Sequence, residues 1–516
     1  MTEVRNAANG QGLYALKTFE NGDIILEEKP IFTLLSPTYD TIQTQFNNFN
    51  GKHKSNQSNF TLLSFLQHIE LPSSIDPSQG GKFRGMIHSA VSFATILTST
   101  SLDKMNTAIS EIQQLYAPST ETSSISAATR DEKEVIIVAK EALRSLQNLS
   151  KVHSNLHNFV TNQPQECLHV MLVWSCNSFT DGLIYKTTSR INHDCDPNAI
   201  VQPVLSDNNM HRIVATSSIQ PGEEITISYL GILTYADNRI RSSVLSATKH
   251  FVCKCNRCAK GIDLASAIPC PSCHPRIMVG KYLDEDVQYD DEKSVCYVYP
   301  PKKCLVCGEI LKASGSVMKM MNKVSDKVSI HLQESCANEE ISREEAGRKR
   351  IIKNDMVEQF YQLSTSVLGA KHWCTNLMLL SFLDQTLNAM NSAMLLQGNS
   401  GKPPDLTEVA ECIDSLERLW EYVQGLNLKA HPGHLLCLQT IGISRILLSL
   451  GDMKSKNYGL EWIRKIEEYV NRGFEMDGVI KVVKTLKNSC EEDSNKCDFE
   501  SMEEDECDAK KRMKIN

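Results

Sequence analysis

The chain has 516 residues, of which 41% are hydrophobic and 22% are charged, as in globular proteins of roughly three folded units. Its formal net charge of −8 excludes a strongly basic protein, so any nucleic-acid surface would have to be a local patch. The opening MTEVRNAANG lacks the apolar core of a secretory signal, and the apolar stretch 434–450 is interrupted and too short to span a bilayer. We therefore expect a soluble protein of the cytoplasm, the nucleus or both.

The first 35 residues predict short β structure. The segments LYALKTF and IILEEKPIF are separated by turn residues around Gly22, and Gly10 and Gly12 predict a tight turn before them. The run Gly10-Gln11-Gly12-Leu13-Tyr14-Ala15 also fits the dinucleotide pattern G-x-G-x-x-A. That fingerprint must follow a buried strand and open a helix, whereas nine mostly polar residues precede this run and a strand-like segment follows it. A turn, or a loop that approaches some other ligand, is the better interpretation.

The middle of the chain alternates between helical and β patterns. Residues 60–116 and 130–160 have apolar residues at helical spacing, and the helix ECLHVMLVWSCNSF is expected to end near residue 179. Segments of β character return over 198–230, with a turn at Pro221-Gly222. From about residue 314 to 488 the pattern is that of a helical array. The last residues are acidic and then basic, a composition that predicts disorder.

The cysteines are clustered in a way that indicates metal binding. None occurs before Cys167, and several close pairs fall between 195 and 307. In a reducing compartment such clusters are metal ligands before they are disulfides. The run Cys253-x-Cys255-x-x-Cys258 supplies three corners of a zinc tetrahedron, and Cys195 is the candidate for the fourth.

A second set of cysteines predicts a second zinc ion. Two C-x-x-C knuckles, Cys270/Cys273 and Cys304/Cys307, lie about thirty residues apart and would form a closed, structural four-thiolate site. His274 and Cys296 remain possible substitutes as ligands, and unliganded thiols in a loop remain the alternative.

Motifs from five separate parts of the chain are informative when they are taken in order. Taken together, they resemble the SET-domain protein lysine methyltransferases, most closely the SET- and MYND-domain (SMYD) branch. The resemblance covers about residues 1–35 and 165–260. The matching motifs are Asn9-Gly10-Gln11-Gly12, Cys176-Asn177-Ser178-Phe179, Asn192-His193-x-Cys195-x-Pro197-Asn198, Gly222-Glu223-Glu224-Ile225 leading to Ser228-Tyr229, and Phe251-x-Cys253-x-Cys255-x-x-Cys258.

The resemblance implies S-adenosylmethionine as cofactor and a lysine side chain as methyl acceptor. Tyr229 would be the catalytic tyrosine, and Phe179 together with Tyr229 would wall the lysine channel. The residues implied at the cofactor are Gly10, Gln11, Gly12, Asn192, His193, Tyr229 and Phe251. The post-SET zinc ligands would be Cys195, Cys253, Cys255 and Cys258, with Cys270, Cys273, Cys304 and Cys307 at the second zinc.

The chain departs from the SMYD pattern in two places. The zinc-binding MYND module is missing, since residues 36–165 contain no cysteine, and Asp194 stands where the family usually has serine. Two other functions remain open: an inactive SET scaffold or transcriptional regulator that acts through protein contacts, and a DNA-binding regulator built on the cysteine knuckles. The acidic residues between the knuckles argue against the last, so we expect no direct nucleic-acid binding.

The expected fold is α+β: a SET β-core split by a helical insert, a cysteine-rich post-SET zinc region, and an all-α C-terminal domain resembling tetratricopeptide arrays. We expect a protein substrate, a histone tail or another lysine-bearing protein, no membrane association, and a partner-docking surface on the C-terminal helices. The predicted boundaries are 1–35 for the N-terminal part of the SET domain, 36–164 for the helical insert, 165–250 for the SET core, 251–313 for the post-SET and knuckle region, 314–488 for the helical domain, and 489–516 for the tail.

Overall fold

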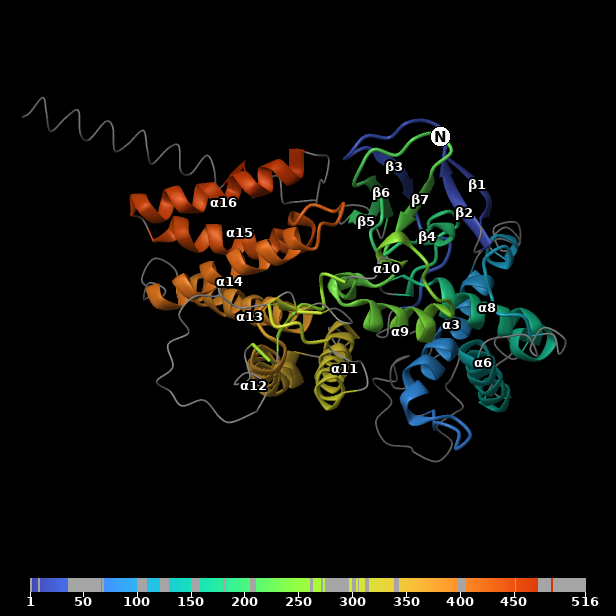
Figure 1. Ribbon diagram of the computed structural model, residues 1–516. Coiled ribbons are helices and arrows are strands. Elements are labelled where there is room, and N and C mark those ends of the chain that lie inside the picture. Colours follow the sequence, from blue (N-terminus) through green and yellow to red (C-terminus); the bar gives the residue numbers. More distant parts are fainter. Residues whose placement is uncertain are drawn as a thin grey trace, which may run out of the picture.

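The computed structural model separates the chain into a β-rich part that carries a helical insert and a second, helical part (Figure 1). The residues that it describes are 2–7, 10–35, 66, 69–99, 109–120, 130–149, 158–179, 182–204, 210–259, 263–270, 272–273, 297–298, 303–304, 306–310, 315–337, 343–397, 405–450, 452–471 and 484–485. The possible ligands His274 and Cys296 and the predicted tail 489–516 lie outside these residues.

Two small sheets form the β-rich part. In the first the strand order is β1-β2-β7-β4: β1 (Thr2–Ala7) and β2 (Gly10–Ala15) form an antiparallel hairpin, and β4 (Asn192–His193) runs parallel to β7 (Glu224–Ile227). The second sheet is antiparallel, in the order β3-β6-β5, from Ile24–Glu28, Met210–Ala215 and Ala199–Val204. Apolar residues of both sheets, including Leu13, Ile213 and Ile225, share a buried core.

The predicted turn at Gly10 and Gly12 is wrong. Both glycines lie within strand β2, where Gly10 pairs with Ala7 and Gly12 pairs with Arg5 of β1. The pattern concealed β1 because it is an edge strand with a largely polar composition, TEVRNA, in which Val4 packs against the sheet core. Alternation of apolar and polar residues is weak when one face of a strand meets water and the other meets little core. The predicted turns at Gly22 and Gly222 are present, and both glycines adopt positive φ angles of 93° and 85°.

The helical insert packs as a separate apolar cluster beneath the sheets (Figure 1). It comprises α3 (Gly80–Ser99), α6 (Arg130–Leu149) and α8 (Pro164–Asn177), which agrees with the prediction for this region. Its ends are joined by β-type contacts: Ile31 donates its backbone N–H to the carbonyl of Ile184 (2.8 Å), and Ile184 donates to the carbonyl of Phe32 (3.0 Å). The insert therefore leaves and re-enters the core at one point.

Helix α9 (Asn238–Lys249) precedes the cysteine-rich segment, in which the short α10 (Asn256–Ala259) lies. Asp237 caps α9 by accepting the backbone N–H of Ile240 (2.9 Å), and the helix ends at His250, which is left-handed with φ 62°. Strands β8 (Ile268–Pro269) and β9 (Tyr297–Val298) pair in the knuckle region.

The C-terminal helices form the predicted all-α layer on the other side of the molecule (Figure 1). Two hydrogen bonds fix this layer to the β-rich part: the Tyr422 hydroxyl donates to the carbonyl of Tyr235 (2.7 Å), and the backbone N–H of Lys429 donates to Asp196 Oδ1 (2.8 Å). The helices are α11 (Ser316–Ala337), α12 (Arg343–Leu368), α13 (Trp373–Gln397), α14 (Leu406–Gly425), α15 (Gly433–Ser449) and α16 (Met453–Asn471).

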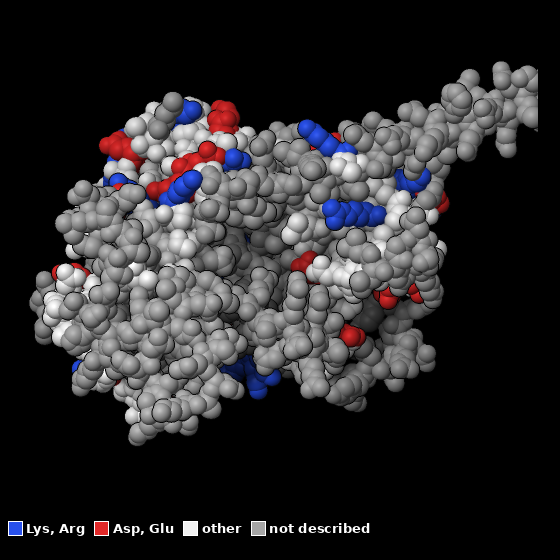
Figure 2. Space-filling model, turned by 180° about the vertical axis from the view of Figure 1, so that it is seen from behind, with Lys and Arg blue, Asp and Glu red and all other residues white. Residues whose placement is uncertain are grey.

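The surface offers two observations about binding. None of the helices in the described part of the chain is long and apolar enough to cross a membrane. On the face seen in Figure 2, the described Lys and Arg side chains lie interspersed with described Asp and Glu side chains.

Candidate functional site

A cavity of about 1440 Å³ lies where the β-rich part, the post-SET segment and the C-terminal helices meet. The sequence-predicted residues that line it are Gln11, Phe179, Asn192, His193, Tyr229 and Phe251. These residues come from five separate stretches of the chain, which the fold brings to one place. Gly10 and Gly12 flank Gln11 in β2 without being among the lining residues.

Asn192 joins three strands at one end of the cavity. Its Nδ2 donates to the backbone carbonyl of Gln11 in β2 (3.0 Å) and to Glu224 Oε1 in β7 (2.7 Å). The residue itself belongs to β4, paired with Thr226. The amide thus holds the Gln11 strand and β7 at a fixed separation beside the cavity.

Asn198 fixes the same strand from the other side. This buried residue, 5% exposed, donates from Nδ2 to the carbonyl of Glu224 (2.9 Å) and accepts at Oδ1 from the backbone N–H of Thr226 (2.8 Å). Its side chain therefore satisfies two polar groups of β7 that would otherwise be buried without partners.

His193 is held between Tyr229 and the first cysteine cluster. Its Nδ1 accepts the backbone N–H of Tyr229 (3.1 Å), and its Nε2 lies 3.2 Å from Cys195 Sγ. Burial lowers the pKa of His193 to about 4, so the imidazole is neutral near pH 7 and can accept at Nδ1. The rings of Tyr229 and Phe251 lie 5.3 and 6.0 Å from that of His193, forming an aromatic group at the cavity wall.

Tyr229 keeps its proton in this site. Burial, with the nearby Glu224 carboxylate, raises the pKa of Tyr229 above its usual value, because the phenolate is disfavoured both by desolvation and by a like charge. The hydroxyl is therefore a donor, and it donates to the backbone carbonyl of Ile191.

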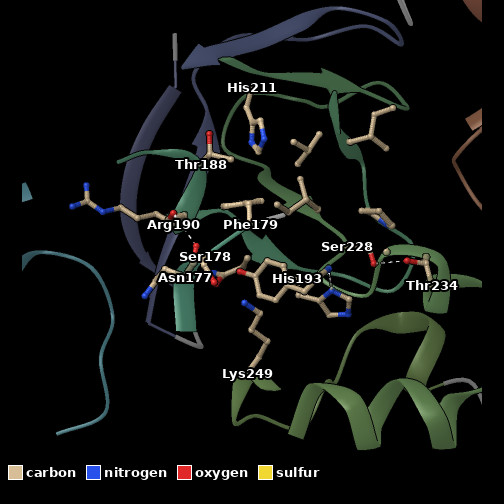
Figure 3. Close-up of a pocket in the computed structure, with 18 of the residues that line it drawn as sticks. Asn177, Ser178, Phe179, Thr188, Arg190, His193, His211, Ser228, Thr234 and Lys249 are labelled. Atoms are coloured by element: carbon tan, nitrogen blue, oxygen red, sulfur yellow. Dashed lines mark hydrogen bonds between the residues drawn. The ribbon is translucent and has the colours of Figure 1, made fainter. Parts of the chain in front are cut away.

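Phe179 follows the C-terminus of α8 and faces the cavity among aromatic rings (Figure 3). Its ring contacts those of Tyr185 (5.5 Å) and His211 (5.2 Å) edge to face, and Tyr185 and His211 stack at 4.0 Å. Burial lowers the pKa of His211 to about 4, so this wall carries no charge at neutral pH. Sequence reasoning missed Tyr185 and His211, because neither stands in a motif.

Asp194, the departure from the family pattern, does not enter the cavity lining. Its Oδ1 accepts the backbone N–H of Asp196 (2.8 Å), which tightens the loop that leads to Cys195. Burial raises the pKa of Asp194 to about 6, since the charged carboxylate is partly desolvated.

The first cysteine cluster contains the four predicted thiols Cys195, Cys253, Cys255 and Cys258, whose sulfurs all lie within 4.8 Å of one another. Cys195 Sγ is 3.9 Å from Cys253 Sγ and 3.5 Å from Cys258 Sγ. A disulfide needs about 2.05 Å, whereas tetrahedral zinc with Zn–S bonds of about 2.3 Å places sulfurs about 3.8 Å apart. The spacing fits a zinc ion.

The charges around this cluster also suit bound zinc. Four thiolates around Zn²⁺ leave a net negative charge, and two arginines compensate for it: fully buried Arg241 has a guanidinium nitrogen 3.8 Å from Cys258 Sγ, and Arg257 donates to the carbonyl of Cys195 (2.9 Å). Sequence reasoning missed both arginines.

The second cluster unites the two knuckles. The sulfurs of Cys270, Cys273, Cys304 and Cys307 lie within 4.8 Å of one another, with Cys270–Cys307 at 3.4 Å and Cys273–Cys304 at 3.8 Å. Gly308 supports the second knuckle with φ 77° and donates its N–H to the carbonyl of Cys304 (3.0 Å). This donor set also fits a structural zinc ion.

The comparisons with known proteins identify the core. Residues 10–230 match the family described as the SET domain. Histone-lysine N-methyltransferase SET5 of Saccharomyces cerevisiae is 34% identical over 89 residues, which cover 17% of this chain and 16% of that protein. A SET and MYND domain-containing protein of Dictyostelium discoideum is 44% identical over 75 residues (14% and 21%), and histone-lysine N-methyltransferase Smyd1 of mouse is 32% identical over 117 residues (18% and 23%).

The matched regions span between 16% and 23% of the length of these relatives. Among solved structures, the SET domain of LSMT bound to lysine and AdoHcy aligns with 85% of this chain and 86% of its own, at 12% identity and a TM-score of 0.30. The sequence matches confirm the predicted SET domain and its SMYD-like character.

Proposed function

Because residues 10–230 of this chain form a SET domain, we propose that the protein is an S-adenosylmethionine-dependent protein-lysine N-methyltransferase. The acceptor is the ε-amine of a lysine in a histone or another protein. The observation that carries the proposal is the convergence of Gln11, Asn192, His193, Tyr229 and Phe251 on one cavity.

The residues present suit an amino-acid nucleoside. Phe251 and the neighbouring His193 ring offer aromatic surface for an adenine, with Asn192 beside them at the adenosine, while the Gln11 strand lines the amino-acid end. Gly10 and Gly12, on either side of Gln11, keep that strand free of bulk. When bound, S-adenosylmethionine supplies an electrophilic methyl group on a sulfonium sulfur.

Tyr229 and Phe179 act on the acceptor. A lysine must lose its proton before its nitrogen can attack, and an apolar aromatic channel lowers the pKa of the entering amine by desolvating its charged form. The protonated Tyr229 hydroxyl orients that amine. Positioning of this kind supplies much of the rate in a displacement that needs no covalent enzyme intermediate.

The zinc ions have structural roles in this proposal. The first cluster ties Cys195, two residues after His193, to the segment that begins at Phe251, so its metal closes the post-SET segment over the cofactor residues. The C-terminal helices contribute Asp384, Leu428 and His434 to the same cavity, and they restrict which protein segments reach the channel.

The test measures cofactor binding and transfer separately, on the zinc-loaded full-length chain. Titration calorimetry should detect S-adenosylmethionine binding, and radiolabelled methyl groups should appear on lysines of a proteome extract, located by mass spectrometry. Tyr229→Phe should keep cofactor binding and lose at least about 100-fold in turnover, as expected for loss of a preorganised donor.

The matched control is Tyr458→Phe, which makes the same chemical change on α16 at a hydroxyl bonded to Glu417. Wild-type turnover in Tyr229→Phe would refute the role of Tyr229. A wild-type chain that does not bind S-adenosylmethionine would refute the enzyme and favour a scaffold.

A further inference from the structure

A lysine of the chain itself occupies the proposed acceptor side of the cavity. Lys249, the last residue of α9, lines the cavity, and in Figure 3 its side chain extends from α9 towards the region of Ser178 and Phe179. Its Nζ lies 5.5 Å from the centroid of the Tyr229 ring. A primary amine is thus already present beside the proposed catalytic tyrosine.

Two helix ends hold this amine in place. Its Nζ donates to the backbone carbonyl of Cys176 (2.8 Å), in the last turn of α8. The left-handed His250 ends α9 by donating its N–H to the carbonyl of Ser246 (3.2 Å). That ending directs Lys249 into the cavity and places Phe251 at its wall two residues later.

The surroundings raise the neutral, nucleophilic fraction of this amine. Burial lowers the pKa of Lys249, and the ammonium of Lys82 on α3 lowers it further, while the Cys176 thiol of α8 acts in the opposite direction. The other titratable group beside it, Tyr229, keeps its proton near neutral pH because its pKa is raised. A neutral amine has the lone pair that a methyl displacement requires.

We propose that Lys249 is a methyl acceptor of its own active site. The inference rests on the proposed function. The Nζ lone pair forms a bond to the methyl carbon as the bond from that carbon to sulfur breaks, and the sulfur keeps the electron pair as a thioether. The nitrogen becomes a secondary ammonium, whose extra proton passes to water.

The first experiment locates the methyl group. The zinc-loaded full-length chain is incubated with S-adenosylmethionine that carries a deuterated methyl group, and peptides are analysed by mass spectrometry. The label should appear on Lys249 in a fraction per unit time that does not depend on protein concentration, as expected for a reaction within one molecule. It should be absent from Lys454, an exposed lysine of α16.

Lys249→Arg is the matched variant, because it keeps a long side chain with an N–H donor for the Cys176 carbonyl and removes the lysine amine. Its label should fall to background while its circular dichroism spectrum stays that of the wild type. The inference would be overturned if the Lys249→Arg chain took up as much deuterated methyl label as the wild type. It would also be overturned if the fraction of Lys249 labelled per unit time rose in proportion to protein concentration.

A second experiment needs no turnover. Acetic anhydride labels amines, and the rate at Lys249 is compared with and without S-adenosylhomocysteine at saturating concentration. Binding should slow the labelling of Lys249 several-fold and leave Lys454 unchanged. An unaltered rate at Lys249 in protein shown by calorimetry to bind the nucleoside would overturn the placement of this amine.

The outcomes separate the two proposals. Methyl groups on other proteins with none on Lys249 would overturn the inference and leave the proposed function standing. Protein that binds S-adenosylmethionine but labels neither Lys249 nor any other lysine would refute the methyltransferase proposal, and the inference with it.

Discussion

Replacement of Asn198 by alanine should loosen β7 and with it the Asn192 end of the cavity. The Asn198 side chain donates to the carbonyl of Glu224 (2.9 Å) and accepts from the N–H of Thr226 (2.8 Å). The truncation leaves both backbone groups buried without partners, and each such loss costs about 1–3 kcal/mol. Taking values from the lower part of that range, we expect β7 to be destabilised by about 2–4 kcal/mol.

The Thr226 amide offers a local assay. Because a chain of several folded units does not unfold in one step, hydrogen–deuterium exchange of the peptide that contains Thr226 is more informative than a global midpoint. A loss of about 2–4 kcal/mol corresponds to exchange faster by about 30- to 900-fold. The full-length chain, loaded with zinc, is used for both variants.

Asn457→Ala is the control, since Asn457 is exposed on α16 and such surface changes stay within about 0.5 kcal/mol. Exchange at Thr226 that is the same in Asn198→Ala as in the wild type would refute the reasoning, because the two hydrogen bonds would then contribute nothing to β7.

Three further predictions concern pH, packing and metal. Burial lowers the pKa of His372 to about 3, whereas the same imidazole in the unfolded chain takes up a proton near pH 6.5. Lowering the pH from 6.5 towards 3 therefore protonates the unfolded chain first. The free energy of unfolding decreases over this range by up to about 1.4 kcal/mol for each pH unit. His372→Asn keeps a side-chain acceptor for the backbone N–H of Cys374 but does not titrate. When the pH is lowered from 7 to 5, the urea midpoint of this variant should therefore decrease less than that of the wild type. Gly369→Ala should destabilise the helical domain by about 1–3 kcal/mol, because the new Cβ would lie 2.6 Å from Pro269 Cδ at a backbone φ of +81°, whereas Gly425→Ala meets nothing within 4 Å and should not. Metal analysis should find two zinc ions per chain and one in Cys258→Ser.

Each of these results can fail in a defined way. Equal pH dependence in wild type and His372→Asn would show that this imidazole titrates normally in the folded chain. Equal denaturation midpoints for Gly369→Ala and Gly425→Ala would remove the proposed clash. A wild-type zinc content in Cys258→Ser would mean that the first cluster does not hold the ion.

The sequence predicted the helices that show apolar periodicity and the cluster whose cysteines have a characteristic spacing. Helix periodicity located α6, α8 and the C-terminal helices, and the spacing of Cys253, Cys255 and Cys258, completed by Cys195, predicted the first cluster. The edge strand β1 escaped because its residues are mostly polar, and Gly10 and Gly12 were therefore taken for a turn. Two glycines separated by one residue do not reveal a partner strand that lies before them in the sequence.

Site residues that belong to sequence motifs could be predicted. Residues that reach the site only because the tertiary fold brings them there could not. Arg241 and Arg257 compensate for the charge of the thiolate cluster, yet in sequence they are ordinary basic residues of short helices. Lys249 is similarly inconspicuous two residues before Phe251. Its position beside Tyr229 depends on a hydrogen bond to the Cys176 carbonyl, which belongs to a helix far away in the sequence.

The hydrogen bonds that join Ile31 and Phe32 to Ile184 have a consequence for how such a protein can diversify. These bonds join the chain segments before and after the helical insert at one place. We therefore expect that the insert can change in length or be replaced without a shift of the sheets that hold Asn192 and His193. Phe179 travels with that insert, on the segment just after α8. Exchange of this insert would then change one wall of the proposed acceptor channel and leave the proposed cofactor residues Asn192 and His193 as they are.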